Sequence, residues 1–359
     1  MSKTKKTSSS IQEKKGVSQQ DITNKDSIKS IKNKRKTKLK IDDLVSDILN
    51  RNITALSRGI TLVESKNTEH INLANSLLKK CLPHANKSIR IGITGVPGVG
   101  KSTFIEAFGN YLISLGKKIA VLAIDPSSSL SKGSILGDKT RMENLVKNPN
   151  AFIRPSASGD SLGGVARKTR ESIILCEAAG FDIIIIETVG VGQSETIVHS
   201  MVDFFLLLQL TGAGDELQGI KRGIIEMADA IAINKADGDN LKRAKMTMIE
   251  YQRTLHLYPE KASNWLPKTT ICSALKNEGI DTIWKIIEEY IKITQENNYF
   301  YQKRNKQNKY WLIQTIENQL KTEFFNKSTI KKELLKQLEL INTNKTTPFA
   351  AAELLLSMK

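Results

Sequence analysis

The spacing of the hydrophobic residues changes twice along the chain. Between residues 41 and 84, apolar side chains recur at helical intervals, which predicts two or three helices. From residue 89 short β-rich runs alternate with longer helical stretches, and after about residue 280 the helical spacing returns. The β-rich runs are IRIGIT (89–94), IAVLAI (119–124), AFIR (151–154), DIIIIE (182–187), DFFLLLQL (203–210), AIAIN (230–234) and TTICS (269–273).

Strands that alternate with helices predict the α/β fold class. A helix between two consecutive strands carries the chain back to its starting edge, so the strands run in the same direction. We therefore expect a mostly parallel sheet with helices on both faces. A helical segment precedes this sheet, and a second one follows it.

The residues after about 280 predict a helical arm. IDTIWKIIEEYIKITQ (280–295) is strongly amphipathic, and helical spacing continues through Trp311, Ile313, Ile316 and Leu320. Such helices must bury their apolar stripe against another surface. The pattern leaves two surfaces open, a second copy of the chain or the chain's own sheet domain.

Charge changes this picture only at the two ends of the chain. The formal net charge is +17, but residues 1–40 contribute +10 and residues 301–359 contribute +6, so the centre is nearly neutral. Residues 1–40 contain no aromatic residue and too few apolar residues to offset the entropy of ordering. We expect a disordered basic tail there, with a tether to RNA, a membrane surface or an acidic partner as the alternative. Nucleic-acid binding would depend on this tail alone, and we do not expect it.

Apolar runs and cysteines indicate the compartment. The longest apolar runs, such as FFLLL at 204–208, fall far short of the roughly 18 residues that a membrane span needs. No apolar segment of the secretory type follows the basic tail. Cys81, Cys176 and Cys272 are widely separated and form no disulfide or zinc pattern. We expect a cytoplasmic protein without a membrane segment.

The stretch GITGVPGVGKST (92–103) predicts a phosphate site. It follows a predicted strand, begins a helical run and satisfies the pattern Gly-x-x-x-x-Gly-Lys-Ser. Small residues let successive backbone N–H groups surround an anion, the helix N-terminus adds positive potential, and the lysine reaches the outer phosphates. The predicted phosphate-binding residues are Gly95, Val96, Pro97, Gly98, Val99, Gly100, Lys101, Ser102 and Thr103.

Two later strand ends predict a guanine base. In AINKAD (232–237), Asn234, Lys235 and Asp237 form an Asn-Lys-x-Asp motif. An aspartate can accept hydrogen bonds from the guanine N1–H and exocyclic amine, whereas adenine has no matching pair of donors. The loop CSAL (272–275) ends the next strand and can offer backbone amides to the guanine O6, through Ser273, Ala274 and Leu275. Together these residues favour GTP and GDP over ATP.

Ser102 and three acidic residues are candidate ligands of Mg²⁺. Asp125 and Glu187 each end a predicted strand, so they face the ligand crevice of an open α/β sheet. Asp138 lies in a loop, where a turn or helix-cap role is the alternative. Mg²⁺ prefers oxygen ligands and is shared with phosphates. We expect Mg²⁺ to bind together with GTP or GDP, and Lys101, Asp125 and Glu187 to be the catalytic residues.

The motifs in their order resemble those of the MeaB family, which includes the methylmalonic aciduria type A proteins and the bacterial ArgK proteins. The family belongs to the SIMIBI class of P-loop GTPases, in the branch whose third motif begins with glutamate, here Glu187. The resemblance spans roughly residues 45–359. It is carried by the P-loop, VLAIDPSSS (121–129), GSILGDKTRM (133–142), IIIIETVGVGQSE (183–195), TGAGDELQGIKRG (211–223), NKAD (234–237), CSAL (272–275) and PFAAAELLL (348–356).

The resemblance implies a GTPase chaperone of an adenosylcobalamin-dependent acyl-CoA mutase, usually methylmalonyl-CoA mutase. Such proteins gate cofactor loading by a cobalamin adenosyltransferase and protect the mutase from inactivation. They are typically homodimers joined through C-terminal helical arms. On matching positions, Lys101 and Ser102 would bind phosphates and Mg²⁺, and Asp125, Asp138 and Glu187 would shape the metal site. Residues 212–223 would form a further switch, with Gln218 and Lys221 as signalling residues.

Composition and hydrophobic spacing divide the chain into four parts, and the resemblance adds the dimerisation role of the last one. The predicted parts are a disordered basic tail (1–40), an N-terminal helical segment (41–88), the GTPase domain (89–290) and a C-terminal dimerisation arm (291–359).

The third motif predicts slow hydrolysis by the isolated chain. In Ras-like GTPases a glutamine directly after Asp-x-x-Gly orients the attacking water. Here Val191 occupies that position, and Gln193 lies two residues further on. We hypothesise that a partner completes the site. Two alternative functions stay open: a protein-kinase-like transport ATPase, as the older label of the family states, and a nickel-insertion GTPase, although the four histidines are scattered.

Overall fold

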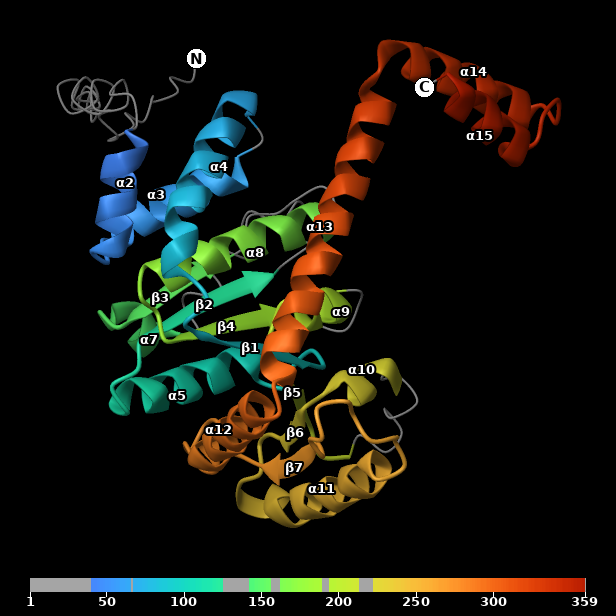
Figure 1. Cartoon of the computed structure of the whole chain (residues 1–359). Helices are drawn as coiled ribbons and strands as arrows, with labels where there is room; N and C mark the ends of the chain where they lie inside the picture. Colours follow the sequence, from blue (N-terminus) through green and yellow to red (C-terminus); the bar gives the residue numbers. More distant parts are fainter. Residues whose placement is uncertain are drawn as a thin grey trace, which may run out of the picture. The chain divides into compact units, whose positions relative to one another are not determined.

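Seven parallel strands form the sheet on which the helices pack. The computed structural model describes residues 40–65, 67–124, 142–155, 162–188, 194–212 and 222–358. The strand order is β3-β2-β4-β1-β5-β6-β7, which confirms the predicted parallel α/β sheet (Figure 1). The strands are β1 (Ile89–Gly95), β2 (Ile119–Ile124), β3 (Ala151–Pro155), β4 (Ile183–Thr188), β5 (Phe204–Gln209), β6 (Ala230–Ile233) and β7 (Lys268–Ile271).

Helices cover both faces of the sheet. One face carries α8, α9, α10 and α11, and the other carries α5, α7 and α12 (Figure 1). The helices are α2 (Ile41–Leu49), α3 (Ile53–Glu64), α4 (Thr68–Cys81), α5 (Lys101–Ser114), α7 (Glu143–Lys147), α8 (Leu162–Ala178), α9 (Ser194–His199), α10 (Arg222–Met227), α11 (Leu241–Leu255), α12 (Ile280–Glu296), α13 (Tyr299–Asn326), α14 (Ser328–Asn342) and α15 (Pro348–Ser357). None of the helices in the described ranges has both the length and the apolar character that crossing a membrane requires.

The isoleucine run of β4 is explained by its two buried faces. Successive side chains of a strand point to opposite sides of the sheet. Ile184 and Ile186 therefore enter the hydrophobic core under α8, while Ile183 and Ile185 enter the core under α5. All four are at most 1% exposed. A strand that is covered on both faces needs an unbroken apolar run rather than an alternating one.

From residue 40, where the described part of the chain begins, three α-helices precede the sheet, within the range of two or three that the spacing predicts for residues 41–84. Asn52 and Asn67 cap the second and third, because their side-chain oxygens accept hydrogen bonds from amides of the first turn, those of Ala55 and Glu69. Helices α2, α3 and α4 contact one another and α8, so their apolar stripes extend the core on that side of the sheet. The predicted basic tail lies outside the described residues, apart from Lys40.

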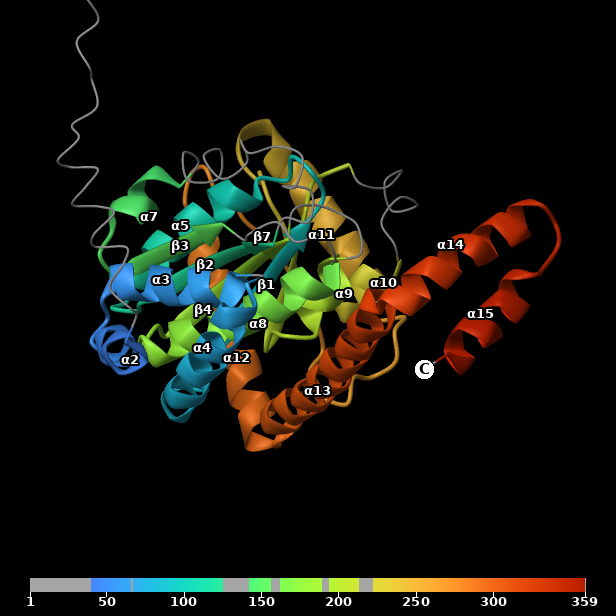
Figure 2. The same cartoon turned by 90° about the horizontal axis from the view of Figure 1, so that it is seen from above.

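The C-terminal helices divide between the sheet and the surface. α12 packs on β5, β7 and α5, and it continues through residue 290, where the sequence prediction ends the GTPase domain. α13 contacts α12 and α8, whereas α14 packs on α13 and α15. Figures 1 and 2 both show α14 and α15 side by side, at the end of α13 and away from the sheet.

The single apolar stripe predicted for α13 has two different environments. Trp311 is buried, while the exposed fractions of Ile313, Ile316 and Leu320 are 45%, 50% and 54%. The first half of α13 therefore packs on the chain's own domain, and the second half presents apolar side chains to solvent. The sequence left these two surfaces open as alternatives, and the helix uses its own domain only for its first turns.

Candidate functional site

The P-loop joins β1 to α5 at the carboxyl edge of the sheet. Gly95 ends β1 so close to β5 that a Cβ atom there would lie 2.5 Å from the carbonyl oxygen of Leu208. Gly100 has a φ of 91°, in the left-handed region that favours glycine, and α5 begins at the next residue. The loop therefore ends on a helix N-terminus whose first N–H groups have no partner within the helix. This is the geometry that binds an anion.

Lys101 lies inside the P-loop and carries a buried charge. Its Nζ donates to the carbonyl oxygens of Gly95 at 2.9 Å and Val96 at 3.4 Å, and the residue is only 9% exposed. Burial lowers the pKa of Lys101, while the carboxylates of Glu187 and Glu195 raise it. The ammonium group is thus held by two P-loop carbonyls. It would exchange these partners for phosphate oxygens when a nucleotide binds.

Two of the predicted metal ligands meet beside Lys101. The register of the sheet places Glu187, near the end of β4, between Ile93 of β1 and Ala123 of β2. Its Oε1 accepts a hydrogen bond from the Ser102 hydroxyl at 3.4 Å, and the residue is 6% exposed. A hydroxyl and a carboxylate at the carboxyl edge of the sheet fit the oxygen ligands that Mg²⁺ prefers.

Other predicted site residues lie outside the described ranges. These are Asp125, Asp138, Gln218 and Lys221, together with Val191 and Gln193. Within the described ranges no group of three or more His, Cys, Asp or Glu residues is placed to hold a metal ion. The structure therefore brings together Ser102 and Glu187, and the other two metal ligands stay predictions.

The Asn-Lys-x-Asp motif lies against the P-loop. Asn234 is 1% exposed and donates from Nδ2 to the Val99 carbonyl at 2.8 Å. Its Oδ1 accepts from the Ala274 amide at 3.1 Å, in the loop after β7. The Lys235 Nζ donates to the Gly98 carbonyl at 2.9 Å. Asn234 thus joins the phosphate loop to both loops of the predicted base site. These bonds fix the distance between the part of the site that would bind phosphates and the part that would bind the base.

Asp237 and the loop after β7 form the other wall of the predicted base site. The Ser273 hydroxyl donates to the Asp237 carboxylate, and it accepts from the Lys276 amide at 3.2 Å. Leu275 is 79% exposed at the rim of this loop. Asp237 is therefore positioned with a carboxylate oxygen toward the segment that was predicted to contact guanine.

Sequence reasoning gave no role to Glu195 or to the Thr94–Thr188 contact. Glu195 stands in the first turn of α9 and is 1% exposed, and its carboxylate raises the pKa of Lys101. The Thr188 hydroxyl donates to that of Thr94 at 2.8 Å and links the ends of β4 and β1. The sequence did contain one signal for Glu195, because it is an acidic residue in the first turn of the helix that follows the third motif. No local pattern marks the threonine pair.

Comparisons with known proteins agree with these motifs. A family model described as "Methylmalonyl Co-A mutase-associated GTPase MeaB" matches residues 56–329. The chain is 44% identical to "GTPase ArgK" of Escherichia coli, over 82% of this chain and 88% of that protein. It is 42% identical to "Methylmalonic aciduria type A homolog, mitochondrial" of Mus musculus, over 88% and 79%. A crystal structure described as "LAO/AO transport system kinase" is similar with a TM-score of 0.72 and 36% identity, covering 89% of this chain and 97% of that one.

The role of Asp237 predicts a change of base preference in Asp237→Asn. An asparagine keeps one acceptor and gains a donor, so it suits xanthine, which carries a carbonyl where guanine carries the amine. We expect GDP affinity to fall about 100-fold, since two hydrogen bonds to a charged group contribute about 3 kcal/mol, and XDP affinity to rise. Titration calorimetry with both nucleotides measures this. Asp239→Asn, at an exposed position two residues away, is the matched control, and an unchanged GDP preference in Asp237→Asn would refute the assignment.

The role of Glu187 predicts a change in metal dependence. Glu187→Gln keeps the size of the side chain and removes the charge that favours Mg²⁺. We expect the Mg²⁺ concentration for half-maximal GTP hydrolysis to rise about tenfold, in the range seen when metal-site groups are altered. Hydrolysis measured across a Mg²⁺ titration tests this, with Glu289→Gln in an exposed ion pair as the control. Superimposable Mg²⁺ curves for the two variants would exclude Glu187 as a ligand.

Proposed function

Since this chain belongs to the MeaB family of GTPases, we propose that it is a GTP-hydrolysing chaperone of an adenosylcobalamin-dependent acyl-CoA mutase, with methylmalonyl-CoA mutase as the client. In this role it gates cofactor loading, with an adenosyltransferase as a further partner, and protects the mutase from inactivation. The family description and the methylmalonic aciduria relatives support this proposal. The observation that carries its nucleotide chemistry is Asn234, which joins the P-loop to the base site.

The proposed hydrolysis depends on charge stabilisation rather than on a covalent intermediate. The P-loop amides surround the phosphates, and Lys101 exchanges its carbonyl partners for phosphate oxygens. Ser102 and Glu187 would hold Mg²⁺, which neutralises negative charge on the phosphates when it is bound. Asp237 and the loop after β7 select the base. Each of these groups lies at the carboxyl edge of the sheet, in a loop, at the end of a strand or at the start of α5, where one nucleotide would contact all of them.

We expect the isolated chain to hydrolyse GTP slowly, because Val191 stands where Ras-like proteins have their water-orienting glutamine. The mutase would complete the site by ordering its loops or by supplying charge. Gln218 and Lys221 are the proposed signalling residues of this response. The three described cysteines are buried free thiols, which fits the reducing cytoplasm that we propose as the compartment.

The proposal predicts that a purified mutase accelerates GTP turnover. We expect at least a tenfold rise when methylmalonyl-CoA mutase is added, measured with γ-labelled GTP so that released phosphate and phosphorylated protein are both counted. The same assay with the Asp237→Asn variant is the control, because GTP hydrolysis that persists in this variant comes from another site or from a contaminant. Equal turnover with and without mutase would contradict the chaperone role. Label on protein rather than on free phosphate would favour a kinase-like transport ATPase instead.

No described cluster favours the nickel-insertion alternative. Of the four histidines, none stands in a metal-binding group with two other His, Cys, Asp or Glu residues of the described ranges. His199 is half-buried with its ring edge-on to Phe205, and burial, with the charge of Lys303, lowers its pKa to about 4. It is therefore neutral at physiological pH and packs on an aromatic ring.

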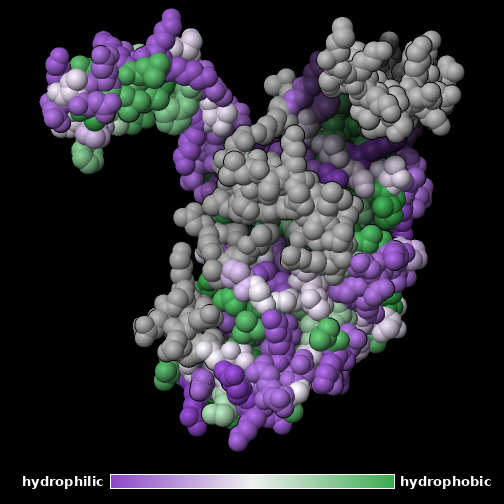
Figure 3. All heavy atoms as spheres, turned by 180° about the vertical axis from the view of Figure 1, so that it is seen from behind, coloured by the Kyte–Doolittle hydropathy of each residue, from purple (hydrophilic) through white to green (hydrophobic). Residues whose placement is uncertain are grey.

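We further propose that the arm, defined as α13 to α15, joins two copies of the chain. Apolar residues are exposed along it, and Figure 3 shows them over α14 and α15. Scattered single apolar residues are normal on a surface, but so many large exposed apolar residues on three successive helices favour an interface. The set comprises Leu312, Ile313, Ile316, Leu320, Phe325, Leu335, Leu338, Phe349, Leu354, Leu356 and Met358.

The dimer proposal predicts that a single charged substitution on the arm converts the dimer to a monomer. Leu320→Glu places a carboxylate in the apolar set, and its desolvation in an interface costs several kcal/mol. We expect sedimentation equilibrium to give a dimer for the natural chain and a monomer for Leu320→Glu. Leu257→Glu is the matched control, since Leu257 is 85% exposed in the turn after α11, which is not part of the arm. A monomeric natural chain at micromolar concentration would overturn the proposal.

A further inference from the structure

The first turns of α13 contact a segment that comes directly after α9. We call residues 303–311 the α13 root and residues 200–203 the connector, which joins α9 to β5. Lys303, Gln307 and Trp311 are four residues apart, so they share one face of the helix. Each donates to a different backbone carbonyl of the connector, namely those of Asp203 at 2.7 Å, Val202 at 2.8 Å and Ser200 at 3.2 Å.

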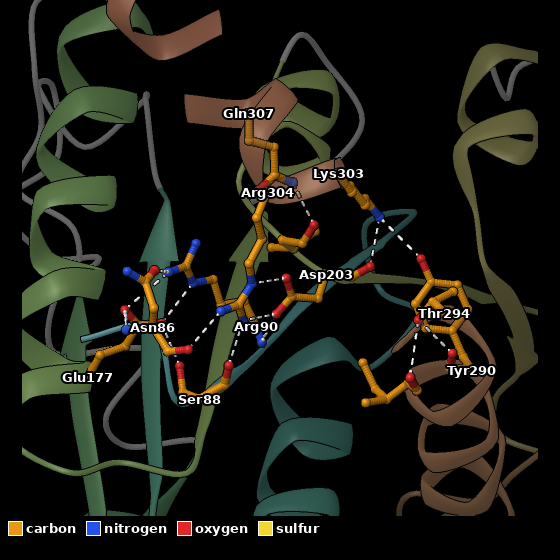
Figure 4. Close-up of polar contacts among 12 residues, drawn as sticks. Asn86, Ser88, Arg90, Glu177, Asp203, Tyr290, Thr294, Lys303, Arg304 and Gln307 are labelled. Carbon is orange, nitrogen blue, oxygen red and sulfur yellow. Dashed lines mark hydrogen bonds and ion pairs between the residues drawn. The ribbon is translucent and has the colours of Figure 1, made fainter. Parts of the chain in front are cut away.

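A buried ion pair fixes the same turn of α13 to the sheet. Arg304 donates to the Asp203 carboxylate from Nε at 2.8 Å and from Nη2 at 2.7 Å (Figure 4). The side chains are 11% and 1% exposed. The Asp203 carboxylate also accepts from the Arg90 amide at 2.8 Å, at the beginning of β1. A pair this buried and this fully hydrogen-bonded holds one geometry, unlike a surface salt bridge.

α9 itself packs on the two strands that carry the predicted phosphate and metal residues. Glu195, in its first turn, is buried, and its carboxylate raises the pKa of Lys101. The side chains of Val198 and Val202 press on β1, because a Cβ atom on Gly92 would meet them at 3.0 and 3.1 Å. α9 also contacts β4, which carries Glu187. The short helix is thus packed between the strand that enters the P-loop and the connector.

A nucleotide at the P-loop would change the contacts of the strands on which α9 packs. Lys101 donates to the P-loop carbonyls of Gly95 and Val96, and an outer phosphate would draw its ammonium away from them. This would change the contacts at the end of β1, and α9 packs both on β1 and on β4, which carries Glu187. A shift of these strand ends would therefore press on α9. Since interiors are close-packed, α9 cannot shift alone without breaking the hydrogen bonds between the connector and the α13 root.

We propose that Lys303, Gln307 and Trp311 are positioning residues that couple the arm to the nucleotide site through α9. A nucleotide shifts α13 relative to the sheet, and a restraint on the arm changes nucleotide affinity by the same factor, because coupling between two binding events is reciprocal. This coupling requires only that a nucleotide binds at the P-loop. It is therefore independent of the proposed client and of the chaperone role.

The test measures the distance between α12 and the far end of α13 in the full chain. Spin labels are placed at Glu288→Cys and Asn326→Cys, both exposed positions. The native thiols are buried, and burial raises the pKa of Cys81 to about 11, that of Cys272 to about 12 and that of Cys176 as well, so they do not react. Labelled chain is diluted with unlabelled chain, and pulsed dipolar spectroscopy is recorded without nucleotide, with GDP and with a non-hydrolysable GTP analogue.

We expect the distance distribution to change with nucleotide in the otherwise natural chain. Gln307→Leu and Trp311→Phe should reduce that change and alter GDP affinity about fivefold, near the lower end of typical coupling. Trp311→Phe keeps an aromatic ring and removes only the Nε1 donor. The matched control is Gln319→Leu on the same helix, whose side chain is exposed and, among the described residues, donates a hydrogen bond to Glu323 of α13.

The outcomes separate coupling from mere support of the fold. A reduced nucleotide response in both variants, with unfolding midpoints close to that of Gln319→Leu, supports the proposal. A nucleotide response equal in all variants, or no response in the natural chain, overturns it. If Gln307→Leu proves unstable, Trp311→Phe alone decides between these results.

Discussion

The arrangement depends on how closely the backbone of β1 approaches that of β5. At Gly95 there is no room for a Cβ atom beside the Leu208 carbonyl, so only glycine lets β1 end against its neighbour and turn into the P-loop. Because β1 lies between β4 and β5, the loop begins beside Glu187. The order of strands then brings the loops after β6 and β7 to the same edge. One close backbone contact thus places the phosphate site and its surroundings.

The polar groups at the two edges of the sheet differ in whether their partners lie within the chain. At the carboxyl edge, backbone amides, Lys101 and carboxylates provide partners that a charged ligand can use. At the amino edge, Arg90, Glu177, Asp203 and Arg304 are ionised groups whose partners are already in the chain. Buried pairs of this kind contribute little net stability, since desolvation offsets attraction, but they allow few alternative positions. Through them, the root of the arm has a defined place on the domain while its outer half stays exposed.

Much of the fold and part of the site were predictable, because their signals are local. The P-loop is a run of nine residues, and Asn234, Lys235 and Asp237 lie within four, so spacing alone predicts their chemistry. The seven strands followed from apolar runs between helical stretches. Long-range contacts had no such signal. Asn234 and Val99 are 135 positions apart, and Gln307 and Val202 are 105 apart. Whether two such residues meet depends on the order of strands in the sheet.

The sequence by itself determined the fold class, the phosphate and base motifs, and the helical character of the C-terminal segment, since periodicity and residue type decide these over a few turns. Tertiary structure alone decided that α9 packs on β1 and β4 while the connector after it bonds to α13, and that one stripe on α13 is buried at Trp311 and exposed at Leu320. The physical reason is that an apolar side chain can pack on any apolar surface, and a charged side chain can pair with any opposite charge. Packing of the whole sheet selects which partner is within reach.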